Sequence, residues 1–304
     1  MPDRQQDPQD PQDKPAPRVS PFLRWAGGKQ QLKRILLAFL PLDVSERTYR
    51  EPFLGGGSLF FALQPRAAIL SDANKHLIKC YEFVRDQPEL VARHLRFHAL
   101  KNTKAHYYRV REEYNNSEFS AAQAARFIYL NKTCFNGIFR VNAKGKFNVP
   151  YGRKESPAIP SDNDLIGIAA ILKNTSLKAS SYEKALENAS KGDFIYLDPP
   201  YPPLNGTAYF THYTIDRFSV QDQTKLADCV NELDRGRCLF MISNADTPLI
   251  RRLYRKYKLV SLPVIRYLTC KSARHKVKEL IITNYEVQGE TPAKVVNRFK
   301  EHDL

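Results

Sequence analysis

The chain has 304 residues, of which 42 % are hydrophobic, enough for one large domain or two moderate ones with a buried core. It has no run of 18 apolar residues and no apolar signal-peptide core at its start, so we expect neither a membrane span nor secretion but a soluble cytoplasmic protein. Lys and Arg number 47 against 32 Asp and Glu, a net charge of +15, which favours a polyanionic partner over a membrane surface, although a basic solvated surface would give the same charge.

The five cysteines are scattered and form no CxxC pair. A disulfide framework or a zinc site is therefore not expected, and the simplest interpretation is buried free thiols in a reducing compartment. We predict no metal.

The predicted elements alternate along the chain. Helices are expected over 32–40, 58–63 and 74–85 and through most of 90–135; loop and hairpin over 136–154; and strands over 48–53, 67–70, 194–197, 238–243, 260–269 and 279–285. The last two strands are expected to pair as a hairpin. Short apolar strands alternating with helices indicate an α/β fold around a mostly parallel sheet.

A glycine-rich turn follows the first predicted strand in REPFLGGGSLFFAL, residues 50–63. Gly55, Gly56 and Gly57 allow a tight turn and close approach of a ligand. The second strand ends at Asp72, and neighbouring first strands in a doubly wound sheet would bring this acid beside the glycines, where it can accept hydrogen bonds from ribose hydroxyls. The run matches neither GxGxxG nor a P-loop. A capping or solvated acid beside a structural turn is the alternative.

A second glycine turn lies in FLRWAGGKQQL, residues 22–32, between Trp25 and Lys29. Trp25 can be a core anchor and Lys29 the solvated start of a helix. Alternatively, Lys29 can hold a carboxylate, such as that of a cofactor with an amino-acid tail.

The stretch DFIYLDPPYPP, residues 193–203, ends a buried strand with an acid, prolines and a tyrosine. The Asp198 carboxylate and the Pro199 carbonyl can both accept hydrogen bonds from one NH2 group, and the Tyr201 ring offers a flat face to a base. Two acceptors localise the lone pair of an exocyclic amine and stabilise the positive charge that develops as it is methylated. The pattern therefore favours chemistry on a nucleobase amine over a plain strand end.

Together these stretches resemble the Dam-type N6-adenine DNA methyltransferases of the D12 class in their alpha arrangement. FLRWAGGK, EPFLGGGS, LSDAN and DPPY are similar to the cofactor and catalytic motifs, and YLNKTCFNGIFRVNAKGKFNVPYGR, residues 129–153, looks like the DNA-recognition region. The resemblance covers roughly residues 20–285. It implies a Rossmann-like sheet that binds S-adenosylmethionine (AdoMet), with an inserted, mainly helical recognition domain.

The resemblance implies a division of the chain and a set of cofactor contacts. We expect a disordered tail over 1–19, a catalytic domain over 20–75 and 161–286, a target-recognition insert over 76–160 and a polar extension over 287–304. The residues implied to contact AdoMet are Trp25, Lys29, Gly55, Gly57, Asp72 and Asp198. Asp198, Pro199 and Tyr201 would carry catalysis, with Tyr201 stacking on an adenine flipped out of the duplex.

By the same resemblance, double-stranded DNA is the partner. Arg140 would read guanine, which points to GATC, while Phe135 and Asn136 would fill the gap left by the flipped base. Pro150 would lie near the recognised bases, and Arg24 and Arg153 look like phosphate contacts. Lys154 stands where the best-known members of the family carry an aromatic residue, and Phe135 stands where some carry a tyrosine. Contacts to the outer base pair of the site could therefore differ.

Other functions remain alternatives. N4-cytosine methylation uses the same acceptors, although serine more often replaces the acid there. C5-cytosine methylation would need a Pro-Cys nucleophile. A dehydrogenase would need GxGxxG. An inactive DNA-binding relative would not need Asp72, Asp198 and Tyr201 intact. We expect a monomer, with a cognate restriction enzyme as one candidate partner.

Overall fold

A computed structural model describes residues 19–202, 218–267 and 274–287, with the backbone alone for 264–267 and 274–277. The predicted tail and the C-terminal extension thus lie almost entirely outside the described residues, as does Cys270. The other four cysteines are free thiols, and three of them are buried. No helix in the described ranges has the length and apolar character needed to span a bilayer.

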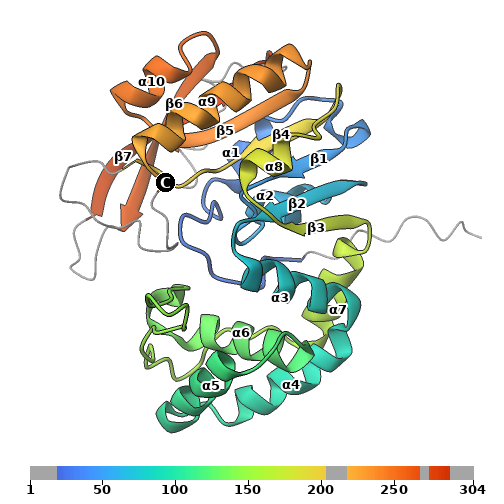
Figure 1. Cartoon of the computed structure of the whole chain (residues 1–304), viewed down its shortest axis with the longest axis vertical. Helices are drawn as coiled ribbons and strands as arrows, with labels where there is room; N and C mark the ends of the chain where they lie inside the picture. The colour runs from blue at the N-terminus through green and yellow to red at the C-terminus, as the bar shows by residue number, and fades with distance from the viewer. Residues whose placement is uncertain (1–18, 203–217, 268–273, 288–304) are drawn as a thin grey trace, which may run out of the picture.

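One seven-stranded sheet, in the order β3-β2-β1-β4-β5-β7-β6, forms the centre of the molecule (Figure 1). Its first five strands are parallel, and β7 is antiparallel to both of its neighbours. The strands are β1 (Tyr49–Glu51), β2 (Ala68–Asp72), β3 (Thr175–Ala179), β4 (Phe194–Leu197), β5 (Leu239–Ala245), β6 (Lys258–Tyr267) and β7 (Arg274–Thr283). The predicted α/β fold and the terminal hairpin are confirmed.

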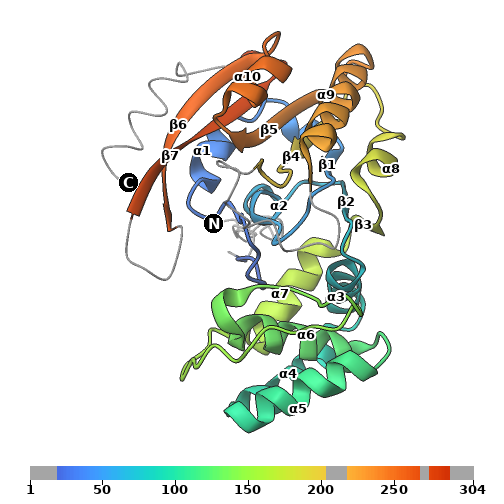
Figure 2. The ribbon, with the colours of Figure 1, turned by 60° about the vertical axis from the view of Figure 1, so that its left-hand side comes forward.

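Helices cover both faces of the sheet. The helices are α1 (Lys33–Ala38), α2 (Ser58–Leu63), α3 (Lys75–Asp86), α4 (Pro88–Leu100), α5 (Lys104–Asn116), α6 (Ala121–Thr133), α7 (Asp162–Leu172), α8 (Tyr182–Leu186), α9 (Val220–Arg235) and α10 (Pro248–Leu253), with short 3-10 turns at Val44–Glu46 and Phe135–Gly137. Helices α1 and α2 lie on one side, and α8 and α9 on the other (Figure 2).

The central strand β4 shows why the sheet is buried on both faces. Phe194 and Tyr196 pack into one core with α1, α2 and α3, whereas Ile195 and Leu197 pack into a second core with α8, α9 and α10. Successive side chains of a strand point to opposite faces, so a strand covered by helices on both sides is apolar throughout.

The helices α4, α5 and α6 form a separate layer below the sheet (Figure 1). Their buried side chains, such as Tyr107 and Ile128, continue the core that contains α3. Helix α6 packs on α3 and α4, and α7 packs on both as well. The segment that the sequence predicts as an insert is thereby joined to the sheet through α3 and α7.

Candidate active site and nucleic-acid interface

The glycine turn follows β1 and lies against the end of β2. Gly55 and Gly57 both adopt positive φ angles, 49° and 66°. The backbone N–H of Gly55 donates to Oδ2 of Asp72 at 3.0 Å, and the N–H of Asn74 donates to Oδ1 at 2.8 Å. Because β1 and β2 are parallel neighbours, the predicted meeting of the glycines with Asp72 is confirmed. Desolvation raises the pKa of the Asp72 carboxyl above its ordinary value.

Trp25 packs directly on this turn. A Cβ atom added to Gly55 would lie 2.7 Å from Cδ1 of Trp25, closer than real side chains approach. The indole also stacks on Phe139, with ring centroids 6.0 Å apart and planes 16° apart. Trp25 therefore lies between the glycine turn and the region that the sequence predicts to recognise DNA.

Lys29 connects the second glycine turn to the end of β4. Its Nζ atom lies 2.7 Å from Oδ1 and 2.9 Å from Oδ2 of Asp198, and it donates to the carbonyl of Gly27 at 2.7 Å. The same ammonium lies 4.8 Å from the centroid of the Tyr201 ring. Lys29 is only 5 % exposed, so the interpretation of it as a solvated helix start is wrong.

Two buried acids that the sequence analysis did not single out adjoin these residues. Glu279 of β7 accepts a hydrogen bond from the Tyr201 hydroxyl at 2.9 Å. Glu51, the last residue of β1, accepts one from the Tyr49 hydroxyl at 2.9 Å. They are 3 % and 2 % exposed. Each acid follows a basic residue in its strand, Lys278 and Arg50 respectively, so the local sequence does not mark either as buried.

The carboxyl groups at the ends of β1, β2 and β4 influence one another. Burial raises the pKa of Glu51 well above its ordinary value, and repulsion from Asp198 and Asp72 adds to the effect. A ligand that carries positive charge would relieve this repulsion. A nucleoside with a charged amino-acid tail fits the set: Asp72 beside the glycines for ribose, and Lys29 for a carboxylate.

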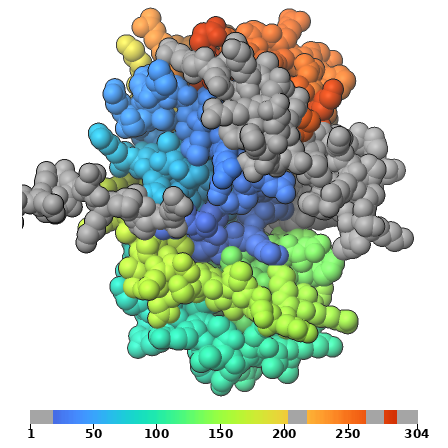
Figure 3. Space-filling model, turned by 180° about the vertical axis from the view of Figure 1, so that it is seen from behind, coloured from blue at the N-terminus to red at the C-terminus, as the bar shows by residue number. Residues whose placement is uncertain are grey.

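The predicted DNA-binding residues share one exposed region. The N–H of Phe135 donates to the carbonyl of Pro150 at 2.9 Å, which holds the start of the recognition segment against its end. The Asn131 side chain bonds to both the N–H and the carbonyl of Arg24, at 2.7 and 2.8 Å. Residues 19–30, in dark blue, lie between the sheet and the helical layer (Figure 3). Asn136 and Arg153 are exposed with positive φ angles of 56° and 54°.

Residues 141–147 form a short hairpin in this region, and the aromatic residues in and around it differ in burial. Phe139 and Phe147 are 9 % and 3 % exposed, so they are packing residues, whereas Phe135 is 43 % exposed. The exposed Arg140 is held by its Nε atom, which donates to Oδ1 of Asn148 at 2.8 Å. Asn148 is a further candidate here, because it orients the guanidinium.

A small basic cluster lies beside the hairpin. Burial lowers the pKa of Lys132 to about 8, with repulsion from Arg24 and Lys154 adding to the shift. The Lys154 ammonium donates to the backbone carbonyl of Lys132 at 3.1 Å. Mutual repulsion of this kind favours an anionic ligand, and Lys132 is a residue that sequence reasoning missed.

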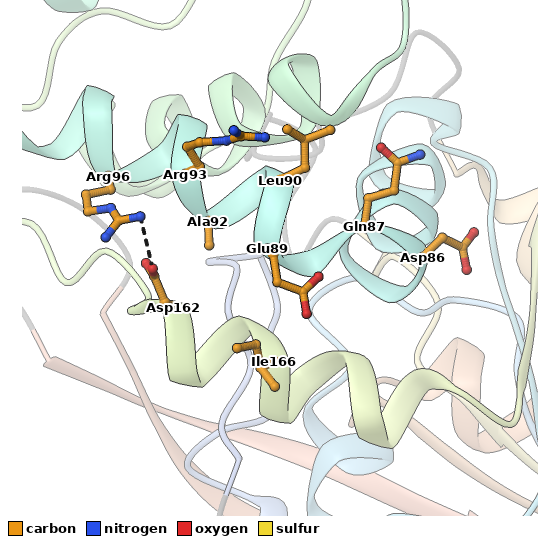
Figure 4. Close-up of a pocket in the computed structure, with 9 residues that line it drawn as sticks. All are labelled: Asp86, Gln87, Glu89, Leu90, Ala92, Arg93, Arg96, Asp162 and Ile166. Carbon is orange, nitrogen blue, oxygen red and sulfur yellow. Dashed lines mark ion pairs between the residues drawn. The ribbon is translucent and has the colours of Figure 1, made fainter.

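A pocket of about 570 Å³ between α4 and α7 is separate from this site (Figure 4). Five of its nine lining residues are charged, and two of them, Arg96 and Asp162, form an ion pair at 3.3 Å. No predicted site residue lines it. No group of three or more metal-ligating side chains occurs among the residues placed by the structure.

Comparison with known proteins gives consistent relatives. The family model for D12 class N6 adenine-specific DNA methyltransferases matches residues 25–267. The Type II methyltransferase M1.LlaDCHI of Lactococcus lactis subsp. cremoris is 39 % identical, over 88 % of this chain and 96 % of its own. The Type II methyltransferase M.MjaIII of Methanocaldococcus jannaschii is 37 % identical, over 88 % and 99 %. The DNA adenine methylase of Escherichia coli K12 is 35 % identical, over 90 % and 98 %.

The family match extends from Trp25, beside the second glycine turn, through Asp198 to the end of β6, so it includes both glycine turns, Asp72 and the turn 198–201. The relatives align over nearly their full lengths. The chain belongs to the D12 class of N6 adenine-specific DNA methyltransferases.

Proposed function

We propose that this enzyme transfers a methyl group from AdoMet to N6 of an adenine that is flipped out of a short duplex DNA site, GATC. The observation that carries the proposal is the contact of Lys29 with Asp198, at 2.7 Å, which joins the glycine turns to the turn 198–201. A cofactor held by the first set of residues would lie next to an amine held by the second.

The cofactor residues have distinct tasks in this proposal. Bound AdoMet supplies an electrophilic methyl group on a sulfonium. Asp72 accepts hydrogen bonds from ribose hydroxyls, and Gly55 and Gly57 let the backbone approach closely. Lys29 pairs with the carboxylate of the amino-acid tail, and Trp25 forms one wall. The buried carboxyls at the strand ends favour a cationic ligand.

The turn 198–201 holds the amine. The Asp198 carboxylate and the Pro199 carbonyl accept hydrogen bonds from its two N–H groups, which makes the nitrogen more tetrahedral and stabilises developing positive charge. Tyr201 stacks on the base while its hydroxyl bonds to Glu279. The chemistry then requires mainly in-line placement, which a rigid turn supplies.

The recognition segment supplies the target site. Arg140, held by Asn148, reads guanine, and exposed Phe135 and Asn136 occupy the space of the flipped adenine. Pro150 lies near the recognised bases, while Arg24 and Arg153 contact phosphates, joined by Lys132. In this proposal residues 76–160 act as the target-recognition domain, and 20–75 with 161–286 as the catalytic one.

The test is single-molecule sequencing of genomic DNA from a methylation-free bacterial host that expresses the protein. N6-methyladenine confined to GATC is the expected result, with no modification from an Asp198→Ala variant that still binds the duplex. N4-methylcytosine would overturn the choice of base, and methyladenine in another motif would overturn the site. Loss of duplex binding by a folded Asp198→Ala protein would contradict the role of Asp198.

A further inference from the structure

A chain of buried amides ends on the turn 198–201. Nε2 of Gln223 donates to the carbonyl of Pro200 at 2.9 Å, and Oε1 of Gln223 accepts from Nδ2 of Asn244 at 3.1 Å. Oδ1 of Asn244 in turn accepts from the backbone N–H of Ala245 at 2.8 Å. Gln223 and Asn244 are both 0 % exposed. Burying polar side chains costs free energy unless they are hydrogen-bonded, so this pair points to a specific role.

The direction of this chain is fixed by its far end. A backbone N–H can only donate, so the atom of Asn244 that faces Ala245 must be the amide oxygen. The NH2 group of Asn244 then faces Gln223, which must present its own oxygen there and its NH2 to Pro200. Each amide therefore has one orientation in which all its partners are satisfied. The first turn of α9 holds Gln223 in place through the capping box of Ser219 with Asp222.

The contact acts on a torsion of the turn that proline does not restrain. The rings of Pro199 and Pro200 lock both φ angles, and a residue that precedes proline is confined to extended ψ values. The ψ angle of Pro200 has neither restraint. It determines where the Pro200 carbonyl points and how Tyr201 is aimed relative to Asp198. A hydrogen bond to that carbonyl therefore restrains this angle directly.

We propose that Gln223, oriented by Asn244, is a positioning residue that fixes the Pro200–Tyr201 junction and so aims the Tyr201 ring relative to the Asp198 carboxylate. This inference rests on the proposed role of the turn in holding adenine. Gln223 contacts neither base nor cofactor in this account. Its loss should slow methyl transfer within the assembled complex and leave the assembly of that complex intact.

The test compares Gln223→Met with a matched variant, Gln123→Met. Methionine has nearly the same shape and removes only the hydrogen bonds. Gln123 of α6 is also a buried glutamine, 3 % exposed, that donates to a backbone carbonyl, that of Tyr114 at 2.7 Å, but it is remote in sequence from the turn. The full-length proteins are assayed for single-turnover methylation at saturating AdoMet and duplex, for both dissociation constants, and for Tm.

We expect Gln223→Met to slow the single-turnover rate by roughly 10- to 100-fold while both dissociation constants stay within about threefold of wild type. Gln123→Met should lower Tm comparably and leave that rate nearly unchanged. A Gln223→Met rate within about twofold of wild type would overturn the inference. So would a loss that appears only in the dissociation constants, or equal slowing by Gln123→Met.

A second variant keeps the test decisive if Gln223→Met does not fold. Asn244→Leu leaves Gln223 in place but releases its orientation, so it should slow transfer less than Gln223→Met. The double variant should be no slower than Gln223→Met alone, because both changes act through one contact. Additive effects, or a fully active Asn244→Leu enzyme, would contradict the proposal that Asn244 acts through Gln223. Should the wild-type protein methylate no adenine, the proposed function itself fails, and that result is distinct from any of these.

Discussion

The Nζ atom of Lys29 lies 2.7 Å from Oδ1 of Asp198, although 169 positions separate the two residues in the chain. Lys29 follows the glycine turn before α1, and Asp198 follows β4. Their side chains are 6 % and 17 % exposed. The ammonium thus bears on both proposed functions at once: it can hold the tail of the cofactor, and it shares the carboxylate that would hold the target amine.

Replacing Lys29 with methionine should weaken AdoMet binding by roughly tenfold or more, because the ion pair with the cofactor carboxylate is lost. It should also lower the free energy of unfolding by roughly 3 kcal/mol, because Asp198 loses its partner. Calorimetric titration and urea unfolding measure the two effects. Arg50→Met is the control, since Arg50 and Asp193 form another buried pair, 2.6 Å apart, just before the start of β4. It should lose similar stability and keep its AdoMet affinity. Equal weakening of AdoMet binding in both variants would contradict the role of Lys29 in holding the cofactor.

Gly55→Ala should strongly weaken AdoMet binding, because the new methyl group would displace Trp25 as well as strain a positive φ angle. Gly145→Ala provides the strain alone: its φ is +72° and no atom lies within 4 Å of the added Cβ. Each should lose about 1–2 kcal/mol of stability from the left-handed backbone. AdoMet titration separates them, and unchanged affinity in Gly55→Ala would show that Trp25 is not part of the binding site.

Arg140→Ala should relax site choice at one base pair, with a loss of discrimination of about 1–3 kcal/mol and a smaller loss of overall DNA affinity. Asn148→Ala should do the same to a lesser degree, because it frees the guanidinium that Asn148 holds. Arg153→Ala is the contrasting variant, expected to weaken binding to all duplexes alike. Methylation rates on duplexes with single substitutions in the site measure these effects. Uniform weakening by Arg140→Ala would make it a phosphate contact instead.

Lowering the pH should reduce the free energy of unfolding through a pair of buried histidines, one in α4 and one in α5. Nδ1 of His98 lies 3.1 Å from Nε2 of His106, and burial lowers the pKa of His98 to about 4, with repulsion from His106 adding to it. Because the unfolded chain, with a pKa near 6.5, binds the proton more readily, this stability is complete above that value and is lost as the pH falls toward 4. The loss should be about 2 kcal/mol between about pH 7 and about pH 5.

His98→Gln should flatten that pH dependence, and His94→Gln, at a half-buried position on the same helix, should largely retain it. Urea unfolding at several pH values between these limits makes the comparison. An unchanged slope in His98→Gln would place the acid sensitivity elsewhere.

The sequence predicts most of the parallel sheet, because β2, β4 and β5 contain short apolar runs and a glycine turn follows β1. It does not predict β3, whose residues Ser176, Lys178 and Ala179 are exposed at the sheet edge and leave little apolar pattern. Helices α7 to α10 were also not predicted individually. The strand order brings Asp72 to Gly55, and that follows from the general rule for doubly wound sheets.

The candidate site could be predicted where a local pattern carries it, as at residues 55–57 and 198–201. The sequence does not predict Glu279 and Gln223 as site residues, because each is identified only by a hydrogen-bond partner far along the chain, Tyr201 and Pro200 respectively. Composition also could not sort the aromatics of the recognition segment. Phe139 is buried by stacking on Trp25, whereas Phe135 is exposed, although each is followed by a basic or polar residue, Arg140 and Asn136 respectively.

Trp25 is the only tryptophan of the chain, and it lies between Gly55 and Phe139. Its fluorescence is therefore a single-site optical signal from the contact between the glycine turn and the predicted recognition segment. A ligand at the glycine turn and a duplex at the recognition segment would each change the surroundings of this one indole. Their binding can thus be followed by stopped-flow emission from the unlabelled protein.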